Sequence, residues 1–399
     1  MNTSLEKLMS RQSQVLMDTY ARYPIGLSQG QGARLFDLDG NQYLDLLAGI
    51  AVVNLGHCHP EITEAVAKQA AKLVHVSNLF HQEEQVVLAE ALLETWRDGR
   101  VFFCNSGAEA NEGAIKLARR YMRRVRQEDR YEILTLTNSF HGRTLATLTA
   151  TGQDKIKDGF DPLPEGFIPV PAWDLEAMDK AMGPHTAAVL LEVIQGEGGV
   201  KPFSQDYLKA VQDLCAKAGA LFMVDEIQTG LCRTGRFWAH QHFGLTPDVI
   251  TCAKGLANGL PMGAVLATPE VAKGFVPGSH ATTFGGGPLL SVVAAKVIEI
   301  MRRDHLDERA ARLGAYAMEK FQDLKADFPG KIAEVRGLGL MLGIELAQDG
   351  KPVWEKLLSR GFILNLTQGT VLRLLPPLII AEEDLDRFTL ALADVLSED

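Results

Sequence analysis

Two stretches of the sequence decide the fold. One apolar run ends in a carboxylate, Leu221-Phe222-Met223-Val224-Asp225, and another ends in a lysine, Val249-Ile250-Thr251-Cys252-Ala253-Lys254. Short, continuously apolar runs of this kind are typical of strands that are buried on both faces of a parallel sheet. Because open α/β sheets bind ligands at the carboxyl ends of their strands, we expect Asp225 and Lys254 to lie at a ligand-binding edge.

The same two residues indicate a particular chemistry. A buried lysine resists protonation and can attack a carbonyl carbon. A neighbouring carboxylate can hold a protonated pyridine nitrogen, and pyridoxal phosphate requires both groups. Taken alone, Asp225 and Lys254 are equally consistent with a helix-capping aspartate and a surface lysine.

The bulk composition narrows the class of protein. The chain has 399 residues, of which 46% are hydrophobic and 23% are charged, as in globular proteins of one large or two medium domains. Its net charge of −10 disfavours nucleic acids and anionic membranes as partners. The five cysteines are scattered and form no C-x-x-C pair, which favours reduced thiols over disulfides or zinc. With no signal-peptide pattern at the start, the expected location is cytoplasmic.

Local patterns predict the order of the elements. Residues 4–20 have the periodicity of an amphipathic helix, and Asp39-Gly40 between two alternating runs predicts a hairpin over residues 34–47. From about residue 60, helical and strand patterns alternate, which predicts a mostly parallel sheet covered on both faces. The expected strands are residues 101–103, 133–136, 187–192, 221–224, 249–251 and 263–267.

We expect two domains. Residues 56–288 form the large α/β domain, which binds the ligand. A smaller α+β domain is built from an N-terminal segment, residues 1–55, and from residues 289–399.

A candidate phosphate site follows the first of these strands. The motif Asn105-Ser106-Gly107-Ala108-Glu109 opens a predicted helix, and Ser106 and Glu109 have the spacing of a capping box. Unpaired N–H groups at a helix start bind anions, and Gly107 would let a phosphate approach closely. Taken alone, the motif fits a capped helix without a ligand better, but its place after a strand, at the expected ligand edge, favours the phosphate site.

Three further motifs lie after predicted strands or in glycine-rich loops. In Phe140-His141-Gly142-Arg143 the aromatic ring can stack on a planar cofactor and the arginine can bind a carboxylate, although a core phenylalanine and a solvated arginine fit the same pattern. The glycines around Glu197 indicate a loop that is packed closely against its surroundings. Two hydroxyls, Thr282 and Thr283, precede a glycine run and a helix start.

Together these motifs resemble the fold-type I, class-III (ω-amino) aminotransferases. The resemblance is carried by residues 106–112, 140–143, 196–199, 224–230, 253–256 and 282–286 and by Arg373. Residues 55–60 and 78–80 resemble the acetylornithine aminotransferase branch of that family. The resemblance implies a homodimeric pyridoxal 5′-phosphate enzyme that moves the terminal amino group of N2-acetylornithine to 2-oxoglutarate, in arginine biosynthesis.

The resemblance also implies roles at the cofactor. Lys254 would form the covalent link to the cofactor and then move the proton, and Asp225 would hold the ring nitrogen. Phe140 would stack on the ring, and Gln228 would contact its O3′ oxygen. The phosphate would be bound by Ser106, Gly107, Ala108 and Thr283 of the partner subunit.

Roles at the substrate follow in the same way. Arg143, with Thr282 nearby, would hold the α-carboxylate of the donor. Arg373 would hold the α-carboxylate of 2-oxoglutarate or glutamate, and Glu197 would pair with it while the ω-amine reacts. One departure from the family is Gly287, where the family has Asn before the proline.

Several alternatives stay open or are disfavoured. Succinylornithine, ornithine, N-acetyl-lysine and 4-aminobutyrate are possible donors. An intramolecular aminomutase is disfavoured because Glu197 and Arg373 suit two alternating substrates. A nucleotide-binding Rossmann protein would need G-x-G-x-x-G after the first strand, and residues 105–112 do not supply it. A catalytically inactive relative would have lost Lys254 or Asp225, and both are present. The spacing of His57-Cys58-His59 matches no common zinc pattern, so we expect no metal.

Overall fold

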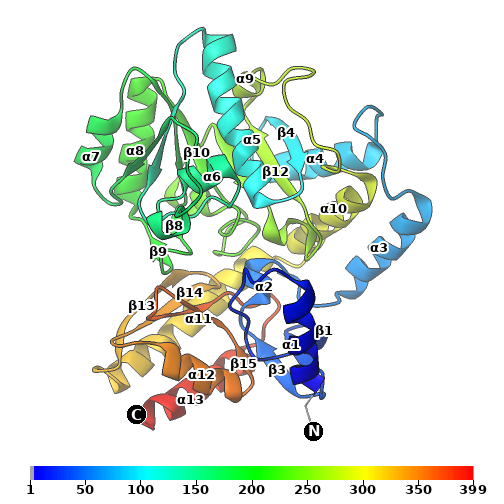
Figure 1. Ribbon diagram of the computed structural model, residues 1–399, viewed down its shortest axis with the longest axis vertical. Helices are drawn as coiled ribbons and strands as arrows, with labels where there is room; N and C mark the ends of the chain where they lie inside the picture. The colour runs from blue at the N-terminus through cyan, green and yellow to red at the C-terminus, as the bar shows by residue number, and fades with distance from the viewer. Residues whose placement is uncertain (1–3, 399) are drawn as a thin grey trace.

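The computed structural model describes residues 4–398, and its largest element is a seven-stranded sheet (Figure 1). The strand order is β4-β12-β11-β10-β7-β5-β6. The strands are β4 (Arg100–Cys104), β5 (Glu132–Leu136), β6 (Phe167–Val170), β7 (Thr186–Leu191), β10 (Leu221–Asp225), β11 (Val249–Cys252) and β12 (Gly263–Ala267). Only β12 runs against its neighbours, because it pairs antiparallel with both β11 and β4. The sheet is therefore mostly parallel, as the sequence predicts.

Helices cover both faces of this sheet. Within β10, Leu221 and Met223 pack on the side of α5 (Gly107–Arg120), whereas Phe222 and Val224 pack on the side of α8 (Gln205–Ala218). Every residue of β7 and β10 is buried. Burial on both faces explains why these strands read as continuous apolar runs rather than as an alternating pattern.

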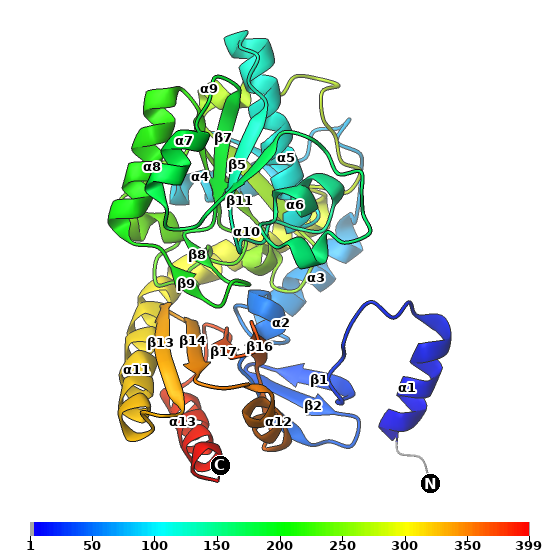
Figure 2. The ribbon, with the colours of Figure 1, turned by 60° about the vertical axis from the view of Figure 1, so that its left-hand side comes forward.

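Two four-stranded sheets, built from both ends of the chain, lie below the large sheet in Figures 1 and 2. One contains β1 (Leu27–Gln31), β2 (Arg34–Asp37), β3 (Gln42–Asp45) and β15 (Phe362–Ile363). The other contains β13 (Ile332–Leu338), β14 (Met341–Leu346), β17 (Val371–Leu374) and β16 (Asn365–Thr367). The antiparallel pairing of β2 with β3 confirms the predicted hairpin, and β15 pairs in parallel with β3. A two-stranded sheet of β8 (Ile194–Gln195) and β9 (Lys201–Pro202) flanks the Glu197 loop.

The remaining helices connect and cover these sheets. They are α2 (Ala48–Ala51), α3 (Pro60–Lys72), α4 (Glu83–Thr95), α6 (Leu145–Ala150), α7 (Leu175–Ala181), α9 (Pro269–Ala272), α10 (Pro288–Arg303), α11 (Leu306–Asp327), α12 (Lys351–Ser359) and α13 (Glu382–Ser397). α10 packs against α3 and α4. Within residues 4–398, no helix is both long enough and apolar enough to cross a membrane.

The predicted N-terminal helix is shorter than expected. The pattern predicts residues 4–20, but α1 spans Ser4–Val15, at the edge of the molecule in Figure 2. None of its residues is buried, and Leu16, Met17 and Tyr20 beyond it are exposed. The helix therefore ends before residues 16–20, which the sequence pattern includes.

Candidate active site

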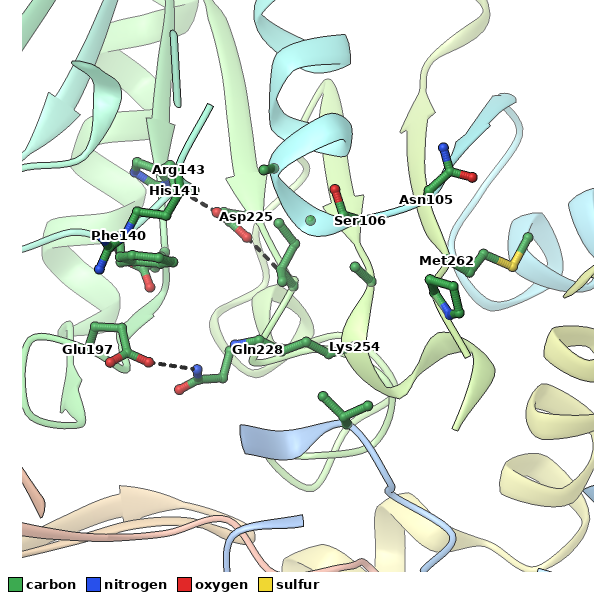
Figure 3. A pocket seen from close by; sticks show the side chains of 18 of the residues that line it. Asn105, Ser106, Phe140, His141, Arg143, Glu197, Asp225, Gln228, Lys254 and Met262 are labelled. Carbon is green, nitrogen blue, oxygen red and sulfur yellow. Dashed lines mark hydrogen bonds and ion pairs between the residues drawn. The ribbon is translucent and has the colours of Figure 1, made fainter. Parts of the chain in front are cut away.

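A cavity of about 450 Å³ opens at the carboxyl ends of β7, β10 and β11 (Figure 3). Asp225 is the last residue of β10, whereas Glu192 follows β7 and Lys254 follows β11. All three side chains line the cavity. Of the residues predicted for the site, nine line the cavity: Ser106, Gly107, Ala108, Phe140, Arg143, Glu197, Asp225, Gln228 and Lys254. The position agrees with the rule that open α/β sheets bind ligands at this edge.

Asp225 is held in one orientation by three donors. Its side chain is almost fully buried at the end of β10. Oδ2 accepts hydrogen bonds from Asn111 Nδ2 at 2.7 Å and from His141 Nδ1 at 2.8 Å, and Oδ1 accepts one from Ile227 N at 3.0 Å. Figure 3 shows His141 and Asp225 joined in this way. A carboxylate fixed so firmly presents a defined charge to the cavity.

Asn111 and His141 are functional residues that the sequence analysis left without roles. Asn111 is fully buried in α5, where it also donates to His141 O at 2.8 Å and accepts from Thr251 Oγ1 at 2.8 Å. A signal was present, because Asn111 interrupts a helix face that otherwise buries small apolar residues such as Ala110 and Ala114. A polar residue on such a face must find buried partners, and those partners can only be read from the tertiary structure.

Lys254 lies just after β11 with a strained backbone. Its φ of 45° is in the left-handed region, which is uncommon for residues other than glycine and is found most often at functional sites. Burial lowers the pKa of Lys254 to about 8, although the carboxylates of Glu197 and Asp225 favour its charged form. A neutral amine, the nucleophilic form, is therefore accessible near neutral pH. At the next residue, Gly255, any Cβ would clash with the Asn54 side chain.

The start of α5 has the geometry of an anion site. Ser106 caps the helix, with its Oγ accepting from Glu109 N at 3.2 Å. A Cβ at Gly107 would lie 2.9 Å from the Ile227 side chain, so only glycine fits without a shift. The N–H groups of Gly107 and Ala108 belong to the first turn, where no helical carbonyl precedes them, and they can bind an anion.

The predicted capping box forms only in part. In a capping box the Glu109 side chain would accept from the backbone N–H of the N-cap residue, Ser106. Here Glu109 Oε2 instead accepts from Asn105 N at 2.7 Å and from Asn105 Nδ2 at 2.8 Å. Asn105 offers a backbone and a side-chain donor together, so it competes successfully for the carboxylate.

Phe140 and Arg143 lie together on the cavity wall. The half-buried Phe140 lines the cavity, and its backbone N–H donates to Glu192 Oε2 at 3.0 Å. The exposed Arg143 places its guanidinium carbon 5.7 Å from the centre of the Phe140 ring, within the range of a cation–π contact. An aromatic face and a cation are thus offered side by side (Figure 3).

Glu197 and Arg373 form an ion pair next to the lysine. Arg373, in β17, places Nη1 2.6 Å from Glu197 Oε1 and donates from Nη2 to Asn365 Oδ1 at 2.6 Å. Gln228 Nε2 donates to the same Glu197 oxygen at 3.5 Å. Burial opposes the ionisation of Glu197, but the charges of Arg373 and Lys254 and the hydrogen bonds from Arg373 and Gln228 together outweigh it, so the pKa of Glu197 lies below its ordinary value. Arg373 itself does not line the cavity.

Thr282 and Thr283 lie outside the cavity of their own chain. Thr282 Oγ1 accepts from Asn105 Nδ2 at 3.1 Å, and Thr283 is exposed. Gly287 caps α10 with an ordinary φ of −60°, so the backbone does not require glycine where the family has asparagine. The contact of Thr282 with the substrate and the contact of Thr283 with the partner subunit's cofactor stay predictions.

These side chains fit pyridoxal phosphate. A fixed carboxylate, an amine of lowered pKa, an aromatic face and a glycine-bearing anion site all border one cavity. A metal has no comparable support, because residues 4–398 contain no group of three or more His, Cys, Asp or Glu side chains placed to hold one. His57 instead hydrogen-bonds Asp45, with Nε2 2.6 Å from Oδ2.

Comparison with known proteins agrees with this chemistry. The family profile described as "Aminotransferase class-III" matches residues 17–396. The chain belongs to the class-III aminotransferases. As a member of this family it is a pyridoxal-phosphate-dependent transaminase with the type I fold.

Two curated members of the family match over almost the whole length. The acetylornithine aminotransferase of Methanocaldococcus jannaschii is 46% identical over 397 residues, which cover 99% of each chain. The acetylornithine aminotransferase of Caldanaerobacter subterraneus is 46% identical over 392 residues, which cover 98% of this class-III chain and 99% of the relative.

Solved structures of aminotransferases share the fold. The ornithine aminotransferase of Toxoplasma gondii has a TM-score of 0.96 at 33% identity, covering 100% of this chain and 96% of that one. The acetylornithine aminotransferase of Elizabethkingia anophelis has a TM-score of 0.90 at 32% identity and covers all of both chains.

Proposed function

We propose that this class-III aminotransferase transfers the terminal amino group of N2-acetylornithine to 2-oxoglutarate. The products are N-acetylglutamate 5-semialdehyde and glutamate, which places the enzyme in arginine biosynthesis. The observation that carries the proposal is the ion pair of Glu197 with Arg373 beside Lys254, because it masks a carboxylate-binding arginine as an ω-amine donor requires. The names of the curated relatives support the choice of donor.

At the cofactor, each residue has a separate task. Pyridoxal phosphate, when bound, supplies an electron sink that stabilises negative charge on the substrate carbon. Lys254 would hold it covalently, and its free amine would move a proton at the reacting carbon of the substrate. Asp225, held by Asn111 and His141, keeps the ring nitrogen protonated. Phe140 would cover the ring and Gln228 would contact the O3′ oxygen.

The phosphate has its own set of ligands. In the same chain it would be bound by the backbone N–H groups of Gly107 and Ala108, in the first turn of α5, and by the Ser106 hydroxyl. Thr283 contributes from the partner subunit.

The two substrates use different cations. The donor's α-carboxylate lies far from its reacting amine, so it binds at the rim, at the exposed Arg143 with Thr282 nearby. The α-carboxylate of 2-oxoglutarate lies next to its reacting keto carbon, so it binds deeper, at Arg373. Glu197 must leave Arg373 for this second substrate to bind, and it must return before the next donor reacts.

The same proposal includes the assembly. The active unit is a homodimer, because Thr283 is exposed in its own chain and takes no part in its own cavity. We place the enzyme in the cytoplasm, in keeping with its acidic charge and its free cysteines. We divide the chain into a large cofactor-binding domain, residues 56–288, and a small domain formed by residues 1–55 and 289–399.

The donor is tested by kcat/KM with 2-oxoglutarate as acceptor. The panel contains N2-acetylornithine, succinylornithine, ornithine, N-acetyl-lysine and 4-aminobutyrate, and Lys254→Ala protein prepared in the same way is the blank. We expect acetylornithine to give the highest value, with ornithine at least about tenfold lower, since one buried or unpaired polar group changes the barrier by about 1.4 kcal/mol or more. A higher value for ornithine would reassign the donor and leave the reaction class unchanged.

A further inference from the structure

Glu192 is a further carboxyl group in the active-site cavity, besides Asp225 and Glu197. It follows β7, whereas Asp225 ends the adjacent strand β10. Its side chain is buried and lines the cavity. Oε2 accepts from Phe140 N at 3.0 Å, and among residues 4–398 neither oxygen has another hydrogen bond or an ion pair.

The two carboxyl groups differ in their partners. Asp225 accepts hydrogen bonds from three donors, whereas Glu192 accepts one. Of the cations nearby, Arg373 pairs with Glu197, and within residues 4–398 Lys254 forms no hydrogen bond or ion pair with Glu192. Arg143 lies at the exposed rim, and His141 donates to Asp225 rather than to Glu192. Glu192 therefore lacks the donors that a buried negative charge needs.

Electrostatics points the same way. Burial raises the pKa of Glu192 well above its ordinary value, and the negative charges of Asp225 and Glu197 raise it further. The Phe140 N–H and Lys254 oppose this shift without cancelling it. Where two neighbouring carboxyl groups have such different environments, the usual outcome is one ionised and one protonated group.

We propose that Glu192 is a positioning residue that works in its neutral, protonated form: it fixes the backbone of Phe140 on the cavity wall and leaves Asp225 as the carboxylate that faces the cofactor ring. The inference deepens the proposed function and rests on the cofactor lying between Phe140 and Lys254. An ionised Glu192 would add a further negative charge to the cavity, beside those of Asp225 and Glu197, and compete with Asp225 for the ring's positive charge.

Two substitutions separate the charge of Glu192 from its hydrogen bond. Glu192→Gln matches the protonated carboxyl in shape and charge and keeps an oxygen for the Phe140 N–H. Glu192→Leu is also neutral but leaves that N–H without an acceptor. Asp248→Asn is the matched control, because Asp248 is a carboxyl group outside the cavity that likewise accepts one backbone N–H, from Phe222 at 2.9 Å, and burial raises its pKa too.

The first measurement uses the cofactor-free protein and needs no activity. In wild type the unfolded chain loses the Glu192 proton above about pH 4.3, whereas the folded chain keeps it, so folding is progressively disfavoured as the pH rises. Glu192→Gln has no such loss. The Tm of Glu192→Gln minus that of wild type should therefore increase between pH 5 and pH 8 by at least about 2 °C. Asp248→Asn should show a rise of the same sign.

The second measurement uses the loaded enzyme. Glu192→Gln should keep kcat within about threefold of wild type and an unchanged visible absorbance spectrum at pH 7, whereas Glu192→Leu should lose at least about tenfold in kcat because a buried N–H is left unpaired. Asp248→Asn should leave the spectrum and kcat unchanged, which separates an effect in the cavity from a general change in stability.

Either measurement can overturn the inference. A Tm difference that stays constant or shrinks with pH would show that Glu192 is ionised in the folded protein. A Glu192→Gln enzyme as impaired as Glu192→Leu, or one that fails to fold, would show that the negative charge is required. Because the unfolding measurement involves neither cofactor nor substrate, failure of the proposed function would appear separately, as wild type without activity toward acetylornithine.

Discussion

Arg373 Nη1 lies 2.6 Å from Glu197 Oε1, and this ion pair presents the carboxylate rather than the guanidinium to the active-site cavity. The arginine is fixed, because its side chain is 1% exposed and is also held by Asn365. The glutamate side chain is 29% exposed, and its loop contains glycines on both sides. A movable carboxylate on an immovable arginine is the arrangement that lets one cavity take two kinds of substrate in turn.

Removing the carboxylate of Glu197 should affect the two half-reactions differently. In Glu197→Ala, Arg373 is permanently unmasked and would draw the donor's α-carboxylate to the wrong end of the cavity. The single-turnover absorbance change with acetylornithine should slow by at least about tenfold, while that with glutamate survives or improves. Glu197→Gln, which removes the charge but keeps a polar side chain, is the control and should behave in the same direction. Equal losses in both half-reactions would show that Glu197 does not control access to Arg373.

Lys254→Ala should remove the visible absorbance of the lysine-bound cofactor and nearly all turnover. Without the amine, the chain has neither its covalent link nor its proton carrier at that position. Lys254→Arg retains a positive charge but no nucleophilic amine, so it should be equally inactive. An absorbance spectrum like that of wild type in either variant would exclude Lys254 as the linking residue.

The rate of cofactor attachment should depend on the pKa of Lys254. Burial lowers this pKa to about 8, and the neutral amine is the form that attacks a carbonyl. The rate constant for appearance of visible absorbance, measured on mixing cofactor-free protein with pyridoxal phosphate, should rise with pH and level off above about pH 8. A rate still rising steeply at pH 10 would mean that the lysine has an ordinary pKa.

Asp225→Ala should weaken cofactor binding and reduce kcat by at least about a hundredfold. Removing one partner of a buried charged pair costs about 3–5 kcal/mol, which corresponds to two or more powers of ten. Asp225→Asn keeps an acceptor for Asn111 and His141 but not the charge, so it should fold like wild type and still lose activity. Cofactor affinity by fluorescence quenching and kcat measure the two effects. A loss below about tenfold would assign the ring nitrogen to another group.

Chains carrying Thr283→Ala and Lys254→Ala should complement each other when mixed. In a mixed dimer, the site that keeps Lys254 receives Thr283 from its partner and has the full set of ligands, whereas neither parent dimer has such a site. After unfolding and refolding the two variants together, cofactor affinity and kcat should exceed those of either parent. Co-refolding wild type with Lys254→Ala calibrates the yield of mixed dimers. A mixture that performs no better than the average of its parents would place Thr283 in its own chain's site.

The buried strands, the ligand-binding edge and the β2–β3 hairpin are determined by the local sequence. Continuous apolar runs identified β7, β10 and β11 because burial on both faces removes the alternation of polar residues. The charges that end β10 and follow β11 indicated the ligand edge, and the Asp39-Gly40 turn indicated the β2–β3 hairpin. These features depend on neighbouring residues and on the geometry of a single element, so a pattern of residues is sufficient to predict them.

The remaining features depend on which distant segments meet, and only the tertiary structure decided them. The reversed direction of β12 follows from pairing with β4, whose residues lie far earlier in the chain. Asp225 is fixed by Asn111 from α5 and His141 from a loop, whereas within residues 4–398 Glu192 accepts a hydrogen bond from Phe140 N alone. No local pattern encodes these contacts, because the ionisation and orientation of a buried carboxyl group depend on the complete set of donors and charges around it in the folded chain.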